Sequence, residues 1–166
     1  MKYMSRLSNW IIATAVLVLG STANPTLAAD LPKACSLLSQ AEAAAALGEP
    51  IQEVSPYDSD AVSHCGFDPG VDDGAFLTLD ISPNDGSGAV TWSRIRPPAD
   101  GGDDLTRIST IAGLGDDAYL VSSGPVGSLN VLKGNLIIGF GIKIGTPDDA
   151  AQRLPDLART VVSRLP

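Results

Sequence analysis

The stretch 128-SLNVLKGNLIIGFGIKI-144 contains the clearest alternation of apolar and other residues in the chain. From position 136 to position 144 every second residue is large and apolar, and Gly139 and Gly141 stand between them. A period of two residues is typical of a strand that buries one face. Because Lys133-Gly134-Asn135 separates this run from residues 128–132, the stretch predicts a β-hairpin at the centre of an antiparallel sheet.

Shorter segments upstream have the composition of further strands. Residues 75–81 alternate most clearly, because their two leucines and one isoleucine fall on one face. Residues 55–63 are polar and rich in turn-forming side chains, which predicts a loop. Residues 89–96 fit a helix and a strand equally well. The remaining strand candidates are residues 51–54, 63–67, 105–111 and 118–122.

Two segments carry the signals of helices. The four residues SQAE that begin at Ser39 form a capping box, and Gly48 is placed for the left-handed position that ends a helix. Thr146-Pro147 begins a second helix, in which apolar residues recur at helical spacing as far as Leu165. Pro155 removes one backbone hydrogen bond from that helix, which predicts a kink or a break.

The order of these elements predicts the fold class. A helix, several antiparallel strands and a closing helix form an α+β domain, in which the N-terminal and C-terminal helices cover one antiparallel sheet. Residues 30–166 are numerous enough to bury a core, and we expect them to form a single domain.

The first 29 residues predict where the protein functions. Lys2 and Arg6 precede an uncharged apolar run at residues 10–20, and small residues follow it. This layout is typical of a secretory signal peptide, and the run is too short to span a bilayer comfortably. We therefore expect residues 1–29 to be removed and residues 30–166 to be exported, as a periplasmic or secreted protein.

Two observations bear on membrane attachment. Cys35 follows Pro32-Lys33-Ala34, which does not fit the lipid-attachment box of a bacterial lipoprotein, so we expect no lipid anchor. No second long apolar run follows the leader, so no transmembrane segment is expected in the mature chain.

The chain is acidic, with a formal net charge of −8. Removal of the leader leaves nine of its 11 basic residues against 19 acidic ones. Such a charge keeps a small protein soluble, and we expect a monomer. The charge disfavours nucleic acid and anionic lipid surfaces as partners, because these bind basic surfaces. A cationic partner would be attracted.

Cys35 and Cys65 are the only cysteines of the chain. An even number in an exported domain favours a disulfide, which at this loop length stabilises by roughly 3 kcal/mol in the chain-entropy model. A metal site is a weaker alternative, because His64 is the only histidine available as a further ligand. A catalytic thiol paired with His64 is also weaker, since adjacent residues of a strand face opposite sides.

Three motifs resemble those of a known group of domains. In chain order the motifs are CSLLSQAE from Cys35 through to Leu47-Gly48, then Cys65-Gly66-Phe67, then GLGDDAY from Gly113. Together they resemble small exported envelope domains and lipoproteins of unknown function that are common in actinobacteria. The resemblance implies a Cys35–Cys65 disulfide, a helix-covered antiparallel sheet similar to the extrinsic photosystem II PsbP fold, and no catalytic residues.

Gly139 and Gly141 are the strongest indication of a binding site. They leave one face of a strong strand without side chains, which allows a helix to pack closely, the sheet to bend, or a ligand to bind. In the last case we expect Trp92 and Tyr119 to line a shallow groove for a small apolar molecule or a peptide. Alternatively, the aromatic side chains fill the core. Two further aromatic candidates for the groove are Phe76 and Tyr57.

Signals for catalysis or metal binding are weak. A Ser/His/Asp arrangement must use His64, whose polar neighbours are Ser63, Asp58 and Asp60. Acidic loops that contain glycine attract calcium, but none has the spacing of an EF-hand, and turns use Asp and Gly for backbone reasons. We therefore predict no catalytic residues, no metal and no cofactor. The acidic loops are residues 68–74, 84–88, 100–104 and 115–117.

Together these observations predict an exported, non-catalytic envelope domain that binds a protein or a small ligand. An exported hydrolase with an unrecognised site is one alternative. A secreted acidic inhibitor or accessory subunit that binds a cationic target is another.

Overall fold

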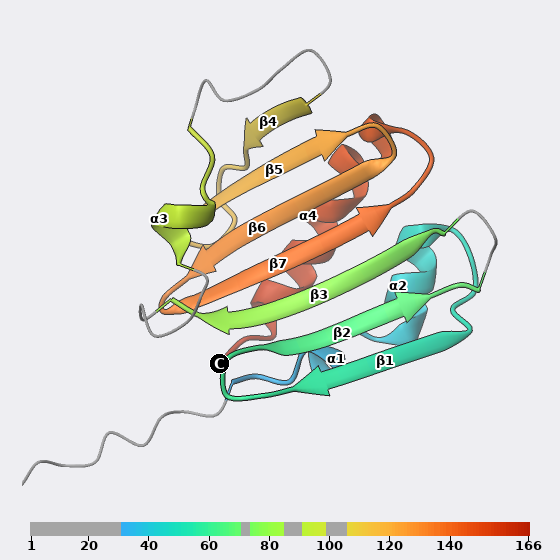
Figure 1. Cartoon of the computed structure of the whole chain (residues 1–166), viewed down its shortest axis with the longest axis horizontal. Helices are drawn as coiled ribbons and strands as arrows, with labels where there is room; N and C mark the ends of the chain where they lie inside the picture. The colour runs from blue at the N-terminus through green and yellow to red at the C-terminus, as the bar shows by residue number, and fades with distance from the viewer. Residues whose placement is uncertain (1–30, 71–73, 85–90, 99–105) are drawn as a thin grey trace, which may run out of the picture.

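The computed structural model describes residues 31–70, 74–84, 91–98 and 106–166. Within these ranges the chain forms four helices and seven strands, and all the strands belong to one antiparallel sheet (Figure 1). The α+β class, the antiparallel sheet and the single disulfide confirm the prediction from the sequence. The predicted signal peptide, residues 1–29, lies outside the described residues.

The sheet consists of two meanders that meet along one pair of strands. The first three strands follow one another across the sheet, and so do the last four, which gives the order β1-β2-β3-β7-β6-β5-β4 (Figure 1). The last strand therefore pairs with the third in the middle of the sheet. The bounds are Glu53–Asp58 for β1, Ser63–Asp68 for β2, Phe76–Pro83 for β3, Thr106–Thr110 for β4, Asp117–Ser123 for β5, Val126–Lys133 for β6 and Leu136–Lys143 for β7.

The predicted hairpin is confirmed as β6 and β7. The buried residues of the two strands lie opposite one another, with Leu129 beside Phe140. Only two residues connect the strands, and the first of them, Gly134, has a φ of 59°. A positive φ at that position is what a type II′ turn requires, and glycine adopts it without strain.

Three of the four described helices pack on one face of the sheet (Figure 1). The helices are α1 (Ala34–Leu37), α2 (Gln40–Leu47), α3 (Trp92–Ile95) and α4 (Pro147–Ser163). The long helix α4 contacts β5, β6 and β7, whereas α1 contacts β2 and β3, and α2 contacts β3 and α4. In the described part of the chain, none of the helices has the length and apolarity that a membrane crossing requires.

The core lies between these three helices and the sheet. Alternate residues of the central strands are completely buried, as the apolar pattern of β3 predicts. Burial of these side chains removes apolar surface from water, which is the main source of stability for the domain. The largest fully buried side chains include Phe67, Phe140, Leu38, Leu77, Leu79, Ile81, Leu129, Ile138 and Leu154.

A glycine of β6, Gly127, allows α4 to approach the sheet. A Cβ built on Gly127 would lie 2.5 Å from the Cβ of Ala150 in α4, closer than two such atoms approach in proteins. Gly139 and Gly141 do not have this role. The atoms nearest to a Cβ built on either glycine belong to side chains of β3 and β6, and none belongs to a helix. Helix packing, one of the alternatives from the sequence, is therefore wrong for these two glycines.

Of the kink or break predicted at Pro155 of the C-terminal helix, the break is wrong. α4 is continuous over Pro147–Ser163 although it contains Pro155. Proline at this position leaves the carbonyl of Ala151 without its helical partner. Ala151 is exposed, so water can bind that carbonyl, while Leu154 and Ala158 on the buried side of the helix belong to the core.

Outside the centre of the sheet, one further prediction is corrected and one open alternative is decided. The sequence predicts a loop at residues 55–63, but β1 extends to Asp58. β1 is an edge strand whose side chains are mostly exposed, so it lacks the alternation that identifies a half-buried strand. Its Pro56 is tolerated because edge strands are where a sheet accepts proline. Within the ambiguous segment 89–96, Trp92–Ile95 form the short helix α3.

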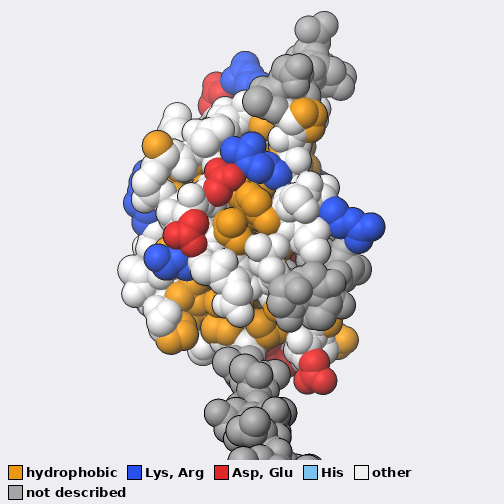
Figure 2. All heavy atoms as spheres, turned by 90° about the vertical axis from the view of Figure 1, so that its left-hand side faces the viewer, with side chains coloured by type: hydrophobic (Ala, Val, Ile, Leu, Met, Phe, Trp, Pro, Cys, Tyr) orange, Lys and Arg blue, Asp and Glu red, His pale blue; other side chains and the backbone are white. Residues whose placement is uncertain are grey.

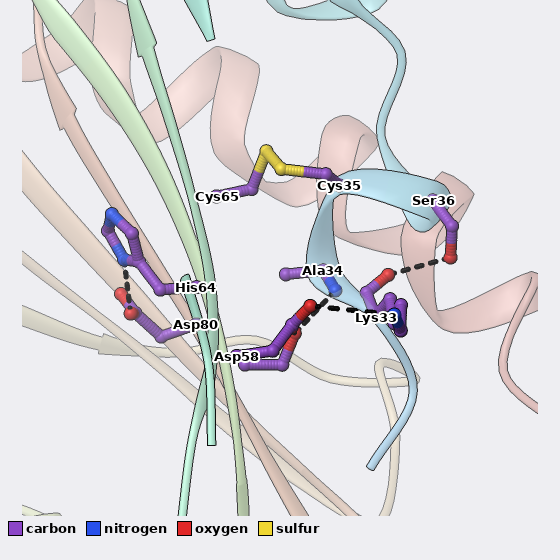
Figure 3. The surroundings of a disulfide bond; sticks show 9 residues. Lys33, Ala34, Cys35, Ser36, Asp58, His64, Cys65 and Asp80 are labelled. Atoms are coloured by element: carbon purple, nitrogen blue, oxygen red, sulfur yellow. Dashed lines mark hydrogen bonds and ion pairs between the residues drawn. A yellow bond between two sulfur atoms is a disulfide. The ribbon is translucent and has the colours of Figure 1, made fainter. Parts of the chain in front are cut away.

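The Cys35–Cys65 disulfide joins α1 to β2 on the helix-covered side of the sheet (Figure 3). The two Cα atoms lie 5.0 Å apart, and the pairing confirms the prediction. Hydrogen bonds hold the same junction, since the backbone N–H of Ala34 donates to the buried Ser63 hydroxyl at 2.8 Å and that hydroxyl donates to Asp58. The helix α1 is thus attached to β2 by a covalent bond and by hydrogen bonds centred on the buried Ser63 hydroxyl.

Removing the disulfide should destabilise the fold without changing its architecture. Replacing both cysteines by alanine (C35A/C65A) relaxes the unfolded chain, and we expect the free energy of unfolding to fall by about 3 kcal/mol. Urea titration followed by circular dichroism measures the change. The wild type reduced with dithiothreitol is the control and should lose a similar amount; equal stability of the oxidised wild type and the double variant would contradict the prediction.

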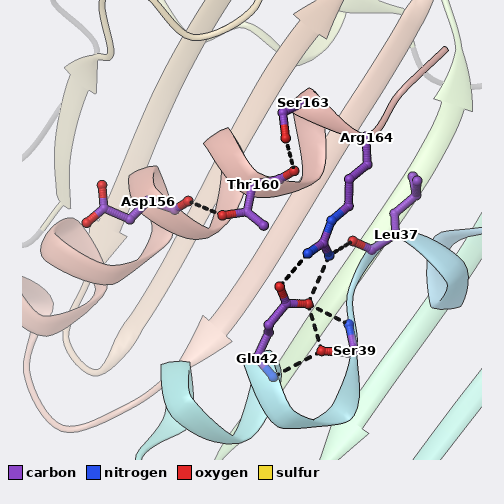
Figure 4. A network of polar contacts seen from close by, with 7 residues as sticks. All are labelled: Leu37, Ser39, Glu42, Asp156, Thr160, Ser163 and Arg164. Carbon is purple, nitrogen blue, oxygen red and sulfur yellow. Dashed lines mark hydrogen bonds and ion pairs between the residues drawn. The ribbon is translucent and has the colours of Figure 1, made fainter.

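Arg164 links the C-terminal end of α4 to the start of α2 (Figure 4). Its guanidinium donates to the two carboxylate oxygens of Glu42 at 2.9 and 2.6 Å, and to the carbonyl of Leu37 at 2.7 Å. Glu42 also completes the predicted capping box by accepting from the backbone N–H of Ser39. The hydrogen bond from Arg164, followed by those from Ser39, lowers the pKa of Glu42 to about 2.

This contact makes stability depend on pH in a defined window. Because the pKa of Glu42 falls from 4.5 to about 2 on folding, the carboxylate favours the folded state above pH 4.5 and loses this effect as the pH falls to 2. Glu42→Gln keeps a side chain suited to the capping box but removes the charge. We expect the wild type to exceed this variant in unfolding free energy by a constant amount above pH 4.5, and by less and less between pH 4.5 and 2.

Chemical denaturation of both proteins at a series of pH values measures this difference. A difference that stays constant down to pH 2 would show that the charge of Glu42 is not linked to folding.

Candidate functional site

The face of the sheet opposite α4 has glycines at its centre. On β7, Ile138, Phe140 and Ile142 are buried on the helix-covered side. Successive residues of a strand point to opposite faces, so Gly139 and Gly141 belong to the other side. Both have polar neighbours on the strands to either side. In the register of the sheet these neighbours are Asp80 and Asn130 beside Gly139, and Thr78 and Ser128 beside Gly141.

Two oxygen atoms lie over the glycines. Asn130 Oδ1 is 3.5 Å from the place where a Cβ on Gly139 would stand, and Thr78 Oγ1 is 2.8 Å from the corresponding place at Gly141. The amide nitrogen of Asn130 donates to the Ser128 hydroxyl at 3.2 Å, which turns its oxygen toward Gly139. A side chain at position 141 would displace the Thr78 hydroxyl, whereas position 139 has room for a Cβ.

These residues form the floor of a groove of about 560 Å³. On the side of β2 it is bounded by Ala61 and Val62, from the turn between β1 and β2. On the side of β5 it is bounded by Ile95 of α3, together with Ile137 of β7. The groove therefore combines a polar floor with apolar walls. Ser82 and Pro83 complete its lining, together with Phe140, whose side chain is buried on the other face of the sheet.

Trp92 and Tyr119 hold α3 against this face of the sheet. Their ring centroids lie 5.3 Å apart with the planes inclined by 53°, and both rings pack with Ile137. The Tyr119 hydroxyl donates to the carbonyl of Ile95 at 2.6 Å, and burial raises the pKa of Tyr119. Neither ring belongs to the groove lining; instead, the two rings support the wall formed by Ile95 and Ile137.

An ion pair fixes the same helix. The Asp117 carboxylate accepts from Nε and Nη2 of Arg96 at 2.6 and 3.2 Å, and from Trp92 Nε1 at 3.1 Å. The Arg96 hydrogen bond is the main cause that lowers the pKa of Asp117, and the Trp92 hydrogen bond adds to it. In Figure 2 the end of the molecule that carries α3 faces the viewer, and hydrophobic side chains gather there in small patches between charged ones. The position of the α3 wall is thus set by contacts outside the groove.

The other two aromatic candidates lie outside the groove. Phe76, at the start of β3, is 36% exposed, and its ring comes within 3.7 Å of the place where a Cβ on Gly141 would stand. Tyr57, on the edge strand β1, is 60% exposed. Neither side chain fills the core and neither is part of the groove lining.

His64 extends the polar face onto β2. Its Nδ1 lies 2.7 Å from Oδ1 of Asp80, its neighbour across the β2–β3 pair (Figure 3). Asp80 Oδ2 has no hydrogen-bond or ion-pair partner among the described residues. Cys65 points to the opposite side of β2, as expected for adjacent residues of a strand (Figure 3).

The residues that the sequence suggests for a hydrolase do not meet around His64. Ser63 is buried on the other face of β2, where it donates to Asp58, and Asp60 lies in the turn between β1 and β2. Asp80 approaches the imidazole instead. Within the described ranges no hydroxyl group hydrogen-bonds to His64 Nε2, so the arrangement is a histidine–carboxylate pair without an adjacent nucleophile.

The acidic loops have structural contacts where they are described. Asp116 accepts from the backbone N–H of Gly134 at 2.6 Å, and Asp117 binds Arg96. Nowhere in residues 31–70, 74–84, 91–98 and 106–166 do three or more His, Cys, Asp or Glu side chains gather closely enough to hold a metal ion. The rest of the acidic loops, at residues 71–73, 85–88 and 100–104, lies outside the described residues.

Sequence reasoning finds the glycines of the groove but not their polar partners. Asp80 and Asn130 occupy polar positions of alternating strands, which is a signal that they face away from the core. The register that brings both of them beside Gly139 is a property of the folded sheet.

Comparison with known proteins yields no relative of this chain. No protein-family model matches the sequence, no curated protein is significantly similar to it, and no solved structure matches its fold. The groove itself is therefore the basis for a functional proposal.

Proposed function

We propose that this protein is an exported, non-catalytic envelope domain that binds a small ligand in the groove over Gly139 and Gly141. The observation that carries the proposal is the glycine floor in the middle of a central strand. Glycine weakens a strand because it costs conformational entropy and offers no side chain for packing. At these positions it instead leaves a hollow, whose volume of about 560 Å³ is typical of small-molecule sites.

The separation of the two faces of the sheet supports a binding role. The N-terminal and C-terminal helices cover one face, and the disulfide lies on that side. The groove lies on the other face, where α3 covers only the part near β5. A ligand can therefore contact the floor of the groove without displacing any part of the core.

Export belongs to the same proposal. The leader at residues 1–29 has the layout of a signal peptide, and a disulfide persists in oxidising compartments outside the cytoplasm. The resemblance to small exported envelope domains supports the same location. The ligand is then a molecule present in the cell envelope or outside the cell.

Expression of the chain with its own leader in a bacterial host tests export. We expect the protein outside the cytoplasm, with an N-terminus at or next to Asp30 and no free thiol, because the leader is removed and the cysteines pair. Mass spectrometry of the intact protein, before and after alkylation, measures both properties. A variant with Lys2→Glu and Arg6→Glu is the control and should stay inside the cell uncut; a full-length wild type with two free thiols would refute export.

A side chain that fills the groove should abolish binding without unfolding the protein. A Cβ on Gly139 would have its nearest neighbours at 3.5 and 3.7 Å, so Gly139→Val adds volume to the groove and none to the core. The neutral apolar dye N-phenyl-1-naphthylamine is expected to bind the wild type with a gain of fluorescence, and to bind this variant at least about tenfold more weakly.

Thr110→Val is the matched control for this experiment. Thr110 lies in the same row across the sheet as Gly139, but on the edge strand β4 and outside the groove. The Thr110→Val variant should bind the dye like the wild type. The wild type, Gly139→Val and Thr110→Val should all melt at similar temperatures. Equal dye binding by the wild type and by Gly139→Val would rule out the groove as the binding site.

A further inference from the structure

The groove presents oxygen acceptors and a single charge to its ligand, and we propose that this ligand is an organic cation whose protonated amine lies over Gly139. The inference rests on the proposed ligand-binding function and specifies the chemical class of the ligand. It follows from the atoms on either side of Gly139 and from the walls of the groove.

Asp80 supplies the negative charge. It is the single charged residue among those that line the groove in the described part of the chain. Its Oδ1 is 2.7 Å from His64 Nδ1, while Oδ2 remains without a partner among the described residues. A carboxylate with an available oxygen accepts hydrogen bonds from a cationic donor, and such charge-assisted bonds are about twice as strong as neutral ones.

Neutral oxygen atoms complete the set of acceptors. Asn130 lies on the other side of Gly139 from Asp80, and its Oδ1 is directed over the glycine because its Nδ2 donates to Ser128. An ammonium group has three donors and no acceptor, so it matches two oxygens that approach from opposite sides. An anionic ligand would instead be repelled by the Asp80 carboxylate and by the net charge of −8 on the chain.

The walls of the groove determine the rest of the ligand. Val62 on one side and Ile95 and Ile137 on the other are apolar, so the amine should carry an aryl or alkyl body that packs between them. A bare divalent metal ion does not match this lining. Such ions bind several carboxylate or carbonyl oxygens, and Asp80 is the one carboxylate among the described lining residues.

Two small molecules of nearly the same shape test the charge requirement. Phenethylammonium and 2-phenylethanol share an apolar body and differ in carrying an ammonium or a hydroxyl group. Each is titrated into the ¹⁵N-labelled mature protein, with its disulfide intact, at neutral pH and low salt, and binding is followed by the chemical shifts of backbone amides. We expect shifts centred on Gly139 and Gly141, and about tenfold tighter binding of the ammonium.

Two variants test the residues that face the amine. Asp80→Asn keeps the shape of the side chain but removes its charge, so the affinity for phenethylammonium should fall to that for 2-phenylethanol. Asn130→Asp places a second carboxylate on the opposite side of Gly139 and should strengthen binding of the ammonium alone. The second variant keeps the proposal testable if the first does not fold. Thr110→Val again serves as the control.

The outcomes separate this inference from the proposed function. If both molecules shift Gly139 and Gly141 with equal affinity, or if neither variant alters ammonium binding, the cation assignment is overturned while the groove remains a binding site. If neither molecule shifts these residues, the cation assignment is also overturned. The dye experiment with Gly139→Val then decides independently whether the groove binds ligands.

Discussion

The pairing of β7 with β3 is the contact on which the rest of the structure depends. It joins the meander of β1 to β3 to the meander of β4 to β7, and its register places Leu79 opposite Phe140 in the core. Because side chains alternate, the same register places Asp80 beside Gly139 on the other face. A register shift of one residue would place the core-facing apolar side chains of β7 in the groove and the glycines on the side of α4. One ladder of hydrogen bonds between strands far apart in the sequence therefore sets both the core and the groove.

The three glycines of β6 and β7 occupy their positions for different reasons. A glycine within a strand costs roughly 0.5–1 kcal/mol relative to alanine, so each needs a compensating reason. At Gly127 the reason is the contact with Ala150 of α4, and at Gly141 it is the Thr78 hydroxyl that occupies the space of a side chain. At Gly139 a Cβ would meet its neighbours at ordinary distances. Packing gives no reason for Gly139, which makes it the position where function is the stronger explanation.

Features that depend on nearby residues were predictable from the sequence, and features that depend on long-range packing were not. The capping box at Ser39 and the glycine turn at Gly134 are local, and both are present where the sequence predicts them, although the turn has two residues rather than three. Pro155 does not break α4, because the packing of the helix on the sheet outweighs one lost hydrogen bond. The strand candidate at residues 51–54 covers only the start of β1, and the rest of β1 escapes detection because an edge strand exposes both faces. Asp80 is recognisable as a polar strand position, but its place beside Gly139 is decided by the pairing of β3 with β7.

His64 and Cys65 show how the two faces of the sheet have separate roles. Cys65 is completely buried and bonded to Cys35, so it contributes to stability on the helix-covered side. His64, the preceding residue, contacts one oxygen of Asp80 on the side of the groove and leaves the other oxygen available (Figure 3). His64 is not part of the groove lining, so in the proposed site its role is to position Asp80. Because the helices and the disulfide stabilise the sheet from the opposite side, residues on the groove face can be selected for recognition at little cost to the core.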